Sequence, residues 1–405
     1  MVSTRSETGS ALMELGLETA FGTGKGVSCR LPFKIGASGP VPAPKESWPG
    51  LAAGAAIAGV PLWMGENVCG FDLNTKFEKG RVVSAPELEW RAKWYCNWQL
   101  QGYGDFVVQA NPQELLLGMP EYALRHLGVH SFDFRWGNEN KKLGYAVKEL
   151  AAARELRTRG YGMAPDPNDP KVMERIAKGQ EGEFQVHANS SAVPYDALMR
   201  KIGELRKLGA RRMSITIPSE RPTDLARGIK FASEAKLDLL TIAVNDSQAV
   251  VLSELICSSL QRLQKRGDFV PDIAVEAAFE SADELVRAFA IATPFVKLVS
   301  LTGAPLERAL KSDQYPGERS TYPGELRGML GEGVKKLPAG ALGVYGYLTD
   351  LADQLHSRLT KARKNSISQL ERSDLLLTPS NGTRTPISDA EREQMAEILD
   401  GKKAF

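Results

Sequence analysis

Four helix–strand units follow one another along the second half of the chain, and this repeat constrains the fold more than any other feature. In each unit, a stretch with apolar residues at helical spacing precedes a short run rich in Ile, Val and Leu. The predicted helices cover residues 195–208, 224–235, 253–266 and 281–292, and the predicted strands cover 212–217, 238–244, 272–276 and 295–301. Such alternation with short loops is typical of a parallel sheet with right-handed crossovers.

Four further apolar runs lie near residues 32, 60, 106 and 130, and they bring the predicted strands to about eight. Parallel strands in this number favour a closed (β/α)8 barrel. An open dinucleotide-binding sheet is disfavoured because the sequence lacks its glycine fingerprint. We therefore expect an α/β protein of the TIM-barrel type, with the barrel between residues 31 and 330.

Two segments do not fit the repeat. Residues 1–30 are small and polar, with closely spaced glycines, and we expect an N-terminal extension that wraps the domain without joining its core. Residues 145–195 are polar and loop-rich, with helical pieces predicted at 145–158 and 170–178. We expect this second segment to be an insertion at one end of the barrel.

Residues 331–405 are predicted to form a C-terminal helical segment and polar tail, with one amphipathic helix at about 344–362 and a mobile end from Thr378.

A helix predicted in the first half of the chain places Trp90, Trp94 and Trp98 on one face. Such a face is typical of packing against a loop or another subunit. The tail and this face are the features that suggest a partner protein subunit.

Composition excludes several classes of function. Hydrophobic residues make up 42% of the chain and charged residues 25%, which is ordinary for a globular protein. A net charge of +2 gives no basic excess for neutralising phosphates, so we expect no nucleic-acid partner. No apolar run is long enough for a membrane span, and the N-terminus lacks the pattern of a secretory signal. We expect neither a membrane partner nor secretion.

The cysteines indicate a reducing compartment. Cys29, Cys69, Cys96 and Cys257 lie far apart, without the paired spacing of a zinc site or of a cysteine-ligated cluster. Reduced thiols of this kind favour a cytoplasmic protein over a disulfide framework. His130 and His187 have no partner at metal-ligand spacing, so we expect structural histidines and no metal site.

The active site of a (β/α)8 barrel lies beyond the C-terminal ends of its strands. The residues that follow the predicted strands form a mostly polar candidate rim, namely Ser38, Gly39, Glu66, Asn67, Gln109, Asn111, residues 138–142, Ser219, Glu220, Asn245, Asp246, Glu276, Thr302 and Gly303. Glu66 and Glu276 are a candidate acid–base pair. The alternative is that these strand ends are polar because they contact solvent.

Residues 132–144 (Phe-Asp-Phe-Arg-Trp-Gly-Asn-Glu-Asn-Lys-Lys-Leu-Gly) are a second candidate for ligand binding. Aromatic and charged side chains alternate in the first half, as in a strand with one buried face. The second half leaves the strand through a glycine into amides and two lysines, and such cationic loops bind anionic ligands. An ordinary connection with solvated lysines remains the alternative.

Four motifs occur in the order found in one known family. Residues 32–39 (Pro-Phe-Lys-Ile-Gly-Ala-Ser-Gly) resemble a first barrel strand with its Gly-Ala-Met-Ser loop, and residues 59–67 resemble a second strand with its Gly-Glu-Gly-Gly turn. Residues 134–141 are similar to Ile-Lys-Ile-Gly-Gln-Gly-Ala-Lys, and residues 366–376 resemble a segment that ends in Arg-(Thr/Ser)-Asp-Leu-Leu. Over roughly residues 20–377 the chain resembles the FMN-binding synthase domain of the glutamate synthase family.

The resemblance implies an FMN-dependent oxidoreductase that reduces an imine formed from a 2-oxo acid and ammonia or an amine. It implies that Asn138 and Lys141 hold the 2-oxo acid. The small-molecule partner that it implies is a 2-oxo acid or an amino acid. The residues it assigns to the cofactor are Gly36, Ala37, Ser38 and Gly303. Its candidate catalytic residues are Glu66 and Asp246.

The chain departs from the family pattern at several of these positions. Thr216 replaces a lysine directed at the flavin, and Glu276 stands in the phosphate turn in place of glycine-rich backbone. Residues 301–304 lack the phosphate arginine, and residues 313–323 lack the cluster cysteines, so no iron–sulfur cluster is expected. These departures favour an alternative, a flavin-free barrel that acts as a binding or scaffolding subunit. A third reading is a new small-molecule site around Glu66, Glu276 and Asp246.

Overall fold

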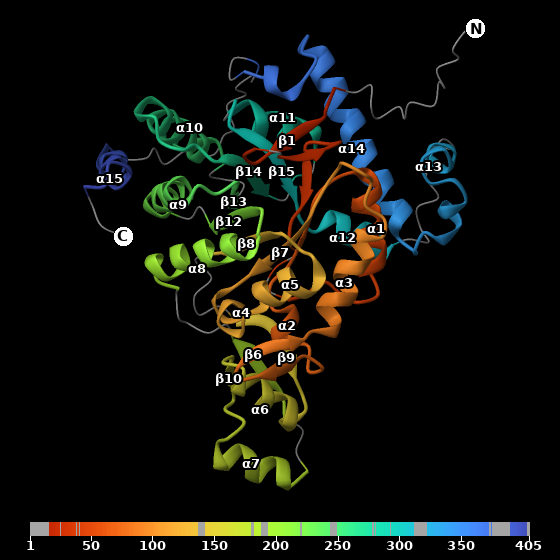
Figure 1. Cartoon of the computed structure of the whole chain (residues 1–405), viewed down its shortest axis with the longest axis vertical. Helices are drawn as coiled ribbons and strands as arrows, with labels where there is room; N and C mark the ends of the chain where they lie inside the picture. The colour runs from red at the N-terminus through yellow and green to blue at the C-terminus, as the bar shows by residue number, and fades with distance from the viewer. Residues whose placement is uncertain are drawn as a thin grey trace.

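The computed structural model describes residues 16–24, 26–37, 39, 41–136, 142–179, 182–187, 193–218, 221–243, 249–277, 279, 281–291, 293–311, 322–371, 374 and 389–402. Its centre is a closed barrel of parallel strands in the order β12-β13-β14-β15-β3-β4-β7-β8 (Figure 1). The strands are β3 (Phe33–Ile35), β4 (Leu62–Met64), β7 (Phe106–Ala110), β8 (Ser131–Arg135), β12 (Arg212–Pro218), β13 (Leu239–Ala243), β14 (Asp272–Ala277) and β15 (Val296–Leu301). The predicted (β/α)8 barrel is confirmed.

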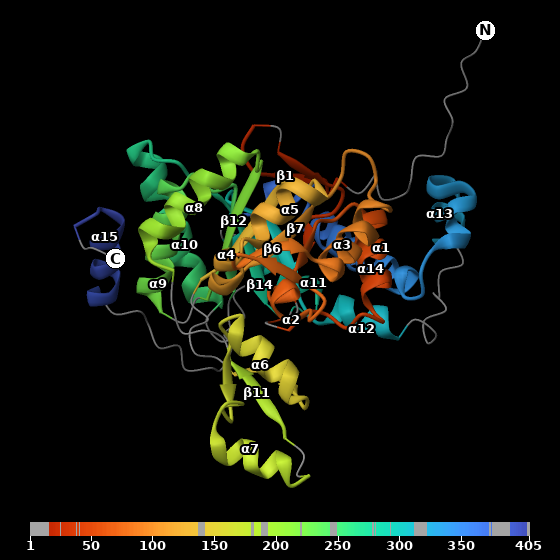
Figure 2. The same ribbon diagram turned by 60° about the horizontal axis from the view of Figure 1, so that its bottom comes forward.

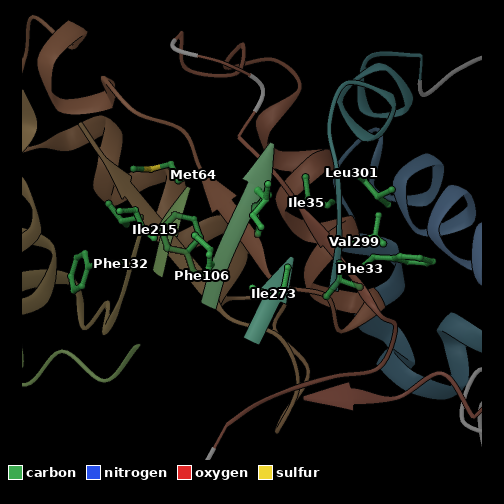
Figure 3. Close-up of a cluster of buried hydrophobic side chains, with 14 of the residues drawn as sticks. Phe33, Ile35, Met64, Phe106, Phe132, Ile215, Ile273, Val299 and Leu301 are labelled. Atoms are coloured by element: carbon green, nitrogen blue, oxygen red, sulfur yellow. The ribbon is translucent and has the colours of Figure 1, made fainter. Parts of the chain in front are cut away.

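Helices surround the barrel and bury the outward-facing side chains of its strands. They are α1 (Trp48–Ala58), α2 (Val68–Phe71), α3 (Pro86–Cys96), α4 (Pro112–Leu117), α5 (Met119–Leu127), α8 (Tyr195–Leu208), α9 (Pro222–Glu234), α10 (Ala249–Arg266), α11 (Ala282–Ile291), α12 (Ala304–Leu310), α13 (Tyr322–Leu330) and α14 (Ala341–Lys361). The outward residues, among them Phe33, Ile35 and Ile215, are buried in one large core (Figure 3). None of the described helices is long and apolar enough to cross a membrane.

Small residues of α1 explain how α14 packs closely against it in the helical layer around the barrel. A Cβ atom on Gly50 would lie 2.3 Å from the backbone oxygen of Ala339, and one on Gly54 would lie 2.6 Å from Cβ of Val344. Only glycine fits at such a close approach of two backbones. The glycines of α1 thus form the surface on which α14 packs.

The N-terminal extension joins the core, which corrects the expectation that it only wraps the domain. Its strands β1 (Thr19–Phe21) and β2 (Val27–Cys29) form a hairpin. Phe21, Val27 and Cys29 are buried in one cluster with residues from the N-terminal half of the barrel interior, namely Trp63, Val107, Leu239, Ala274 and Leu298. The hairpin is recruited because these interior side chains would otherwise meet water at the open end of the barrel.

The insertion is an ordered subdomain with its own core, and the expectation of a loop-rich segment is wrong. A three-stranded antiparallel sheet, β10-β11-β9, carries two helices and projects from the barrel (Figure 2). Its elements are β9 (Lys142–Val147), α6 (Leu150–Thr158), β10 (Gly162–Ala164), α7 (Pro170–Ala177) and β11 (Phe184–His187). The helices predicted at 145–158 and 170–178 are present as α6 and α7. Residues 145–147, however, belong to strand β9, because alternate residues Tyr145 and Val147 pack on the subdomain core, which includes Phe71 of α2.

The remaining elements lie at the edges of the barrel. They are the hairpin β5 (Lys76–Glu78) and β6 (Arg81–Ser84), the 3-10 helices η2 (Gly331–Lys336) and η3 (Ile367–Gln369), and the helix α15 (Asp389–Leu399). The prediction of a mobile end from Thr378 is wrong for α15, where Met395, Ile398 and Leu399 are buried. Arg262 of α10 forms an ion pair with Asp400 just after this helix.

Candidate active site

Polar side chains line the C-terminal half of the barrel interior. The N-terminal half of the interior is the apolar cluster that the hairpin covers. On four strands, an inward residue of this cluster is followed two positions later by a polar residue, as in Val107 and Gln109, or Leu298 and Ser300. We call this set the polar inner wall, and its members are Lys34, Gln109, Asp133, Arg135, Ser214, Thr216, Thr241, Glu276 and Ser300. Because side chains alternate along a strand, these residues share the face opposite to the outer core.

Asp133 of β8 is the hub of one side of this wall. It is fully buried and accepts hydrogen bonds from Gln109 Nε2 at 2.7 Å, Ser214 Oγ at 2.6 Å and Thr216 Oγ1 at 2.8 Å. A buried carboxylate is tolerated when several donors replace its water. The three donors come from the neighbouring strands β7 and β12, so Asp133 fixes the geometry of this part of the wall.

Lys34 of β3 reaches across the barrel. Its Nζ donates to Thr241 Oγ1 of β13 at 2.9 Å and lies 4.0 Å from the centre of the Trp63 ring. Complete burial lowers the pKa of this ammonium, while the nearby carboxylates of Glu276 and Asp133 act in the opposite direction. Thr241 pairs in register with Thr216 of β12, so Lys34 bonds to the residue next to Thr216 in the sheet.

The other side of the wall contains an ion pair. Arg135 of β8 lies 3.8 Å from Glu276 of β14, and Ser300 Oγ donates to the same carboxylate at 2.8 Å. Two buried atoms of the wall, Arg135 Nε and Gln109 Oε1, have no hydrogen-bond partner among the described residues. One is a donor and the other an acceptor, so among the described residues the wall has one unpaired group of each kind.

Glu66 follows β4 and is almost completely buried. Its negative charge helps burial to raise the pKa of a second buried carboxyl, that of Glu114 of α4, and the pKa of the Tyr161 hydroxyl of the insertion. Glu276 instead has Arg135 and Ser300 as partners. The described contacts therefore do not bring Glu66 and Glu276 together as a pair, and their acid–base partnership stays a prediction.

The other predicted site residues divide into two groups. Gly36 and Ala37 are buried at the end of β3, and a Cβ on Gly36 would lie 2.4 Å from Ser300 Oγ. Gly303 precedes α12 with a φ of 75°, and open space surrounds it. Ser38, Asn138, Lys141 and Asp246 lie outside the described residues.

Sequence reasoning missed most of the polar inner wall. The rule for barrel active sites points to residues after the strands, whereas Lys34, Ser214 and Thr241 lie within them. The available signal was a polar residue at alternate positions of otherwise apolar strands, and several strands show it together. Among the described residues no cluster of His, Cys, Asp or Glu is arranged to hold a metal ion.

Comparison with known proteins adds the fold relationship. No protein-family model matches the sequence, and no curated protein sequence matches it. The flavin-binding domain of flavocytochrome b2 from baker's yeast superposes with a TM-score of 0.51 at 13% identity, over 95% of this chain and 79% of that one. A substituted flavocytochrome b2 with pyruvate bound gives 0.51 at 12% identity, over 97% and 80% of the two chains. The chain shares the barrel fold of these proteins.

Proposed function

We propose that this protein is an FMN-dependent oxidoreductase of the glutamate-synthase type, which reduces an imine formed from a 2-oxo acid and ammonia or an amine. The observation that carries the proposal is the polar inner wall, with one unpaired buried donor at Arg135 Nε and one unpaired buried acceptor at Gln109 Oε1 among the described residues. The ordered family motifs in the sequence and the barrel shared with flavocytochrome b2 support it.

The described residues fit the polar edge of a flavin. That edge carries carbonyl oxygens and a ring N–H group, which are complementary to Arg135 Nε and Gln109 Oε1. A cation near the ring would stabilise the negative charge of the reduced form, and Lys34 supplies one from β3 although Thr216 occupies the expected lysine position. When bound, FMN would supply the hydride.

At the substrate end of the proposed site, Glu66 is the proton donor. As an acid it would give a proton to the nitrogen of the imine, and its burial would exclude bulk water from that proton. The roles of Asn138 and Lys141 in holding the carboxylate of the 2-oxo acid, and of Asp246 as a second acid, are part of the same proposal. Flavocytochrome b2 has been obtained with pyruvate, a small 2-oxo acid, in the same kind of barrel.

The visible spectrum of the purified protein tests this proposal. Flavin absorption bands at near-stoichiometric amounts, or saturable uptake of added FMN, are the expected result. The variant Arg135→Lys keeps the charge but removes the Nε donor, so we expect FMN affinity to fall about tenfold or more. The exposed Arg157→Lys in the insertion is the matched control and should leave affinity unchanged.

A second candidate function rests on a different observation. Glu276 stands where the family binds phosphate, and its carboxylate is already bonded to Ser300 and paired with Arg135. A phosphate next to this carboxylate would be repelled. This arrangement favours a flavin-free barrel that serves as a binding or scaffolding subunit of a larger complex. A colourless protein that takes up no added FMN would support this second function and contradict the first.

A further inference from the structure

The helix α2, directly after Glu66, is held at both ends by residues from other elements. It has only four residues, Val68–Phe71, and a single turn of this kind is not stable by itself. Its first residues are preceded by Asn67, whose φ of 70° is in the left-handed region and whose side chain does not cap the helix. The conformation of the turn that carries Glu66 therefore depends on its surroundings.

Glu114 caps the beginning of α2. Its Oε1 accepts the backbone N–H of Cys69 at 3.3 Å, and the backbone of Asn67 forms a further hydrogen bond with the same carboxyl group. The other oxygen, Oε2, is buried without a hydrogen-bond partner among the described residues. Glu114 is itself fixed, because its backbone N–H donates to Asn111 Oδ1 at 2.9 Å at the start of α4.

The insertion holds the same turn from the other side. Tyr161 donates its hydroxyl to Asn67 Oδ1 at 2.8 Å, and Asn111 Nδ2 donates to the same oxygen at 2.6 Å. Arg159, buried beside Tyr161, donates to the backbone oxygens of Gly70 at 2.9 Å and Asp72 at 2.8 Å at the end of α2. The turn is thus clamped between α4 and the insertion.

We propose that Glu114 and Tyr161 are positioning residues for Glu66, and that they act by holding the next residue, Asn67: Glu114 through the Asn67 backbone and Tyr161 through the Asn67 side chain. The role of Glu66 as the proton donor rests on the proposed function, whereas the positioning of its carboxyl group does not. The insertion then has a role in the candidate site, since its Tyr161 hydroxyl group helps to hold the turn that carries Glu66.

The charges around Glu114 make this support measurable. Burial raises the pKa of Glu114 to about 8, and the charge of Glu66 adds to the effect. The other groups that face this cluster are Cys69 and Asp72 from the α2 region, Glu87 from α3, and Arg159 and Tyr161 from the insertion. Burial also raises the pKa of the Cys69 thiol and of the Tyr161 hydroxyl well above their usual ranges, so Glu114 is the member expected to change charge near pH 8.

The test is a carboxyl-carbon NMR titration of protein labelled at its glutamate side chains, with resonances assigned by Glu66→Gln and Glu114→Gln. In the unsubstituted protein, we expect the Glu66 resonance to show a second step near pH 8, which Glu114→Gln abolishes. Tyr161→Phe removes the hydroxyl and keeps the ring, and we expect it to shift the Glu66 titration by about half a pH unit or more.

Tyr145→Phe is the matched control. Tyr145 also lies in the insertion and stacks on Phe71 of α2 at 4.5 Å between ring centroids, but its contact is made through the ring. A Glu66 titration that is unchanged in Tyr161→Phe, or that shifts equally in both tyrosine variants, would overturn the proposal. An absent pH 8 step in the unsubstituted protein would overturn the part assigned to Glu114.

The measurement requires neither FMN nor a substrate, which separates it from the proposed function. If the protein is colourless and the Glu66 titration shifts as expected, the positioning role of Glu114 and Tyr161 stands and the proposed flavin chemistry is wrong. If the protein is yellow and the Glu66 titration is the same in the variants as in the unsubstituted protein, the flavin chemistry stands and the positioning role is wrong.

Discussion

Lys34 and Thr241 are joined by a hydrogen bond of 2.9 Å across the interior of the barrel, although β14 and β15 separate their strands in the sheet. This bond exists because the barrel is closed, and it places a buried ammonium close to Asp133 and Glu276. With Arg135 included, two positive and two negative side chains balance the polar inner wall. A balanced set of charges is what a low-dielectric interior requires.

Removing the Lys34 charge should therefore destabilise the fold. We expect Lys34→Met, which keeps the length of the side chain, to lower the free energy of unfolding by about 3–5 kcal/mol, because the buried Asp133 and the partly buried Glu276 would lose a counter-charge. Urea unfolding measures the change. Lys93→Met on the exposed face of α3 is the control and should change stability by less than about 0.5 kcal/mol. An equally small effect for Lys34→Met would contradict the balance.

Asp133→Asn tests the hub of the wall. The amide would present donors to Gln109, Ser214 and Thr216, which all donate to the carboxylate in the native protein. We expect a loss of at least about 3 kcal/mol, because buried donors would be left unpaired. Asp169→Asn at the start of α7 is a suitable control, since asparagine caps a helix as well as aspartate does. Equal stability of the two variants would show that the three hydrogen bonds to Asp133 do not stabilise the fold.

The stability of the protein should depend on pH through Glu114. The unfolded state ionises near pH 4.5, whereas burial raises the pKa of the folded-state carboxyl to about 8. Between these values unfolding releases a proton, so the stabilising contribution is complete below pH 4.5 and is lost as the pH rises to 8. The loss is at most about 1.4 kcal/mol per pH unit.

Glu114→Gln isolates this effect, because glutamine mimics the un-ionised acid and does not titrate. In urea unfolding at pH 5, 6, 7 and 8, we expect the variant to gain stability relative to the unsubstituted protein as the pH rises. The exposed Glu174→Gln on α7 should show a difference that does not grow with pH. A pH-independent difference for Glu114→Gln would mean that Glu114 is ionised throughout.

Two glycine variants provide a matched pair with opposite signs. A Cβ on Gly70 would lie 1.7 Å from the Tyr161 hydroxyl, so Gly70→Ala should cost about 1–3 kcal/mol and loosen the insertion from α2. Gly203 lies inside α8 with open space around it, so Gly203→Ala should stabilise the protein by about 0.5–1 kcal/mol. Thermal unfolding distinguishes the two, and a stable Gly70→Ala variant would disprove the close packing of Tyr161.

Local patterns predicted the barrel well. The four helices predicted between residues 195 and 292 agree with the structure to within a few residues at their ends, because each has a continuous apolar stripe that a neighbouring strand covers. In the insertion the two helices were predicted, but the three strands were not. These strands are short, and their partner Phe71 lies far away in the sequence, so the alternation at Tyr145 and Val147 had no local confirmation.

The candidate site was predicted only in part for a similar reason. Glu66 follows a strand, and the rule for barrel active sites identifies it. Glu114 lies in a helix whose sequence resembles any other amphipathic turn, and nothing local shows that it caps α2 or that burial keeps it un-ionised. A pKa depends on solvent exclusion and neighbouring charge, and both are set by distant residues.

By itself the sequence determined that this chain forms a barrel of parallel strands surrounded by helices, since periodicity is a property of neighbouring residues. Only the tertiary structure decided which polar residues meet. The curvature of the closed sheet brings Lys34 of β3 to Thr241 of β13, and the folding of the insertion brings Tyr161 to Asn67. These contacts join residues that are far apart along the chain, and their energies depend on burial that exists only when the barrel is complete.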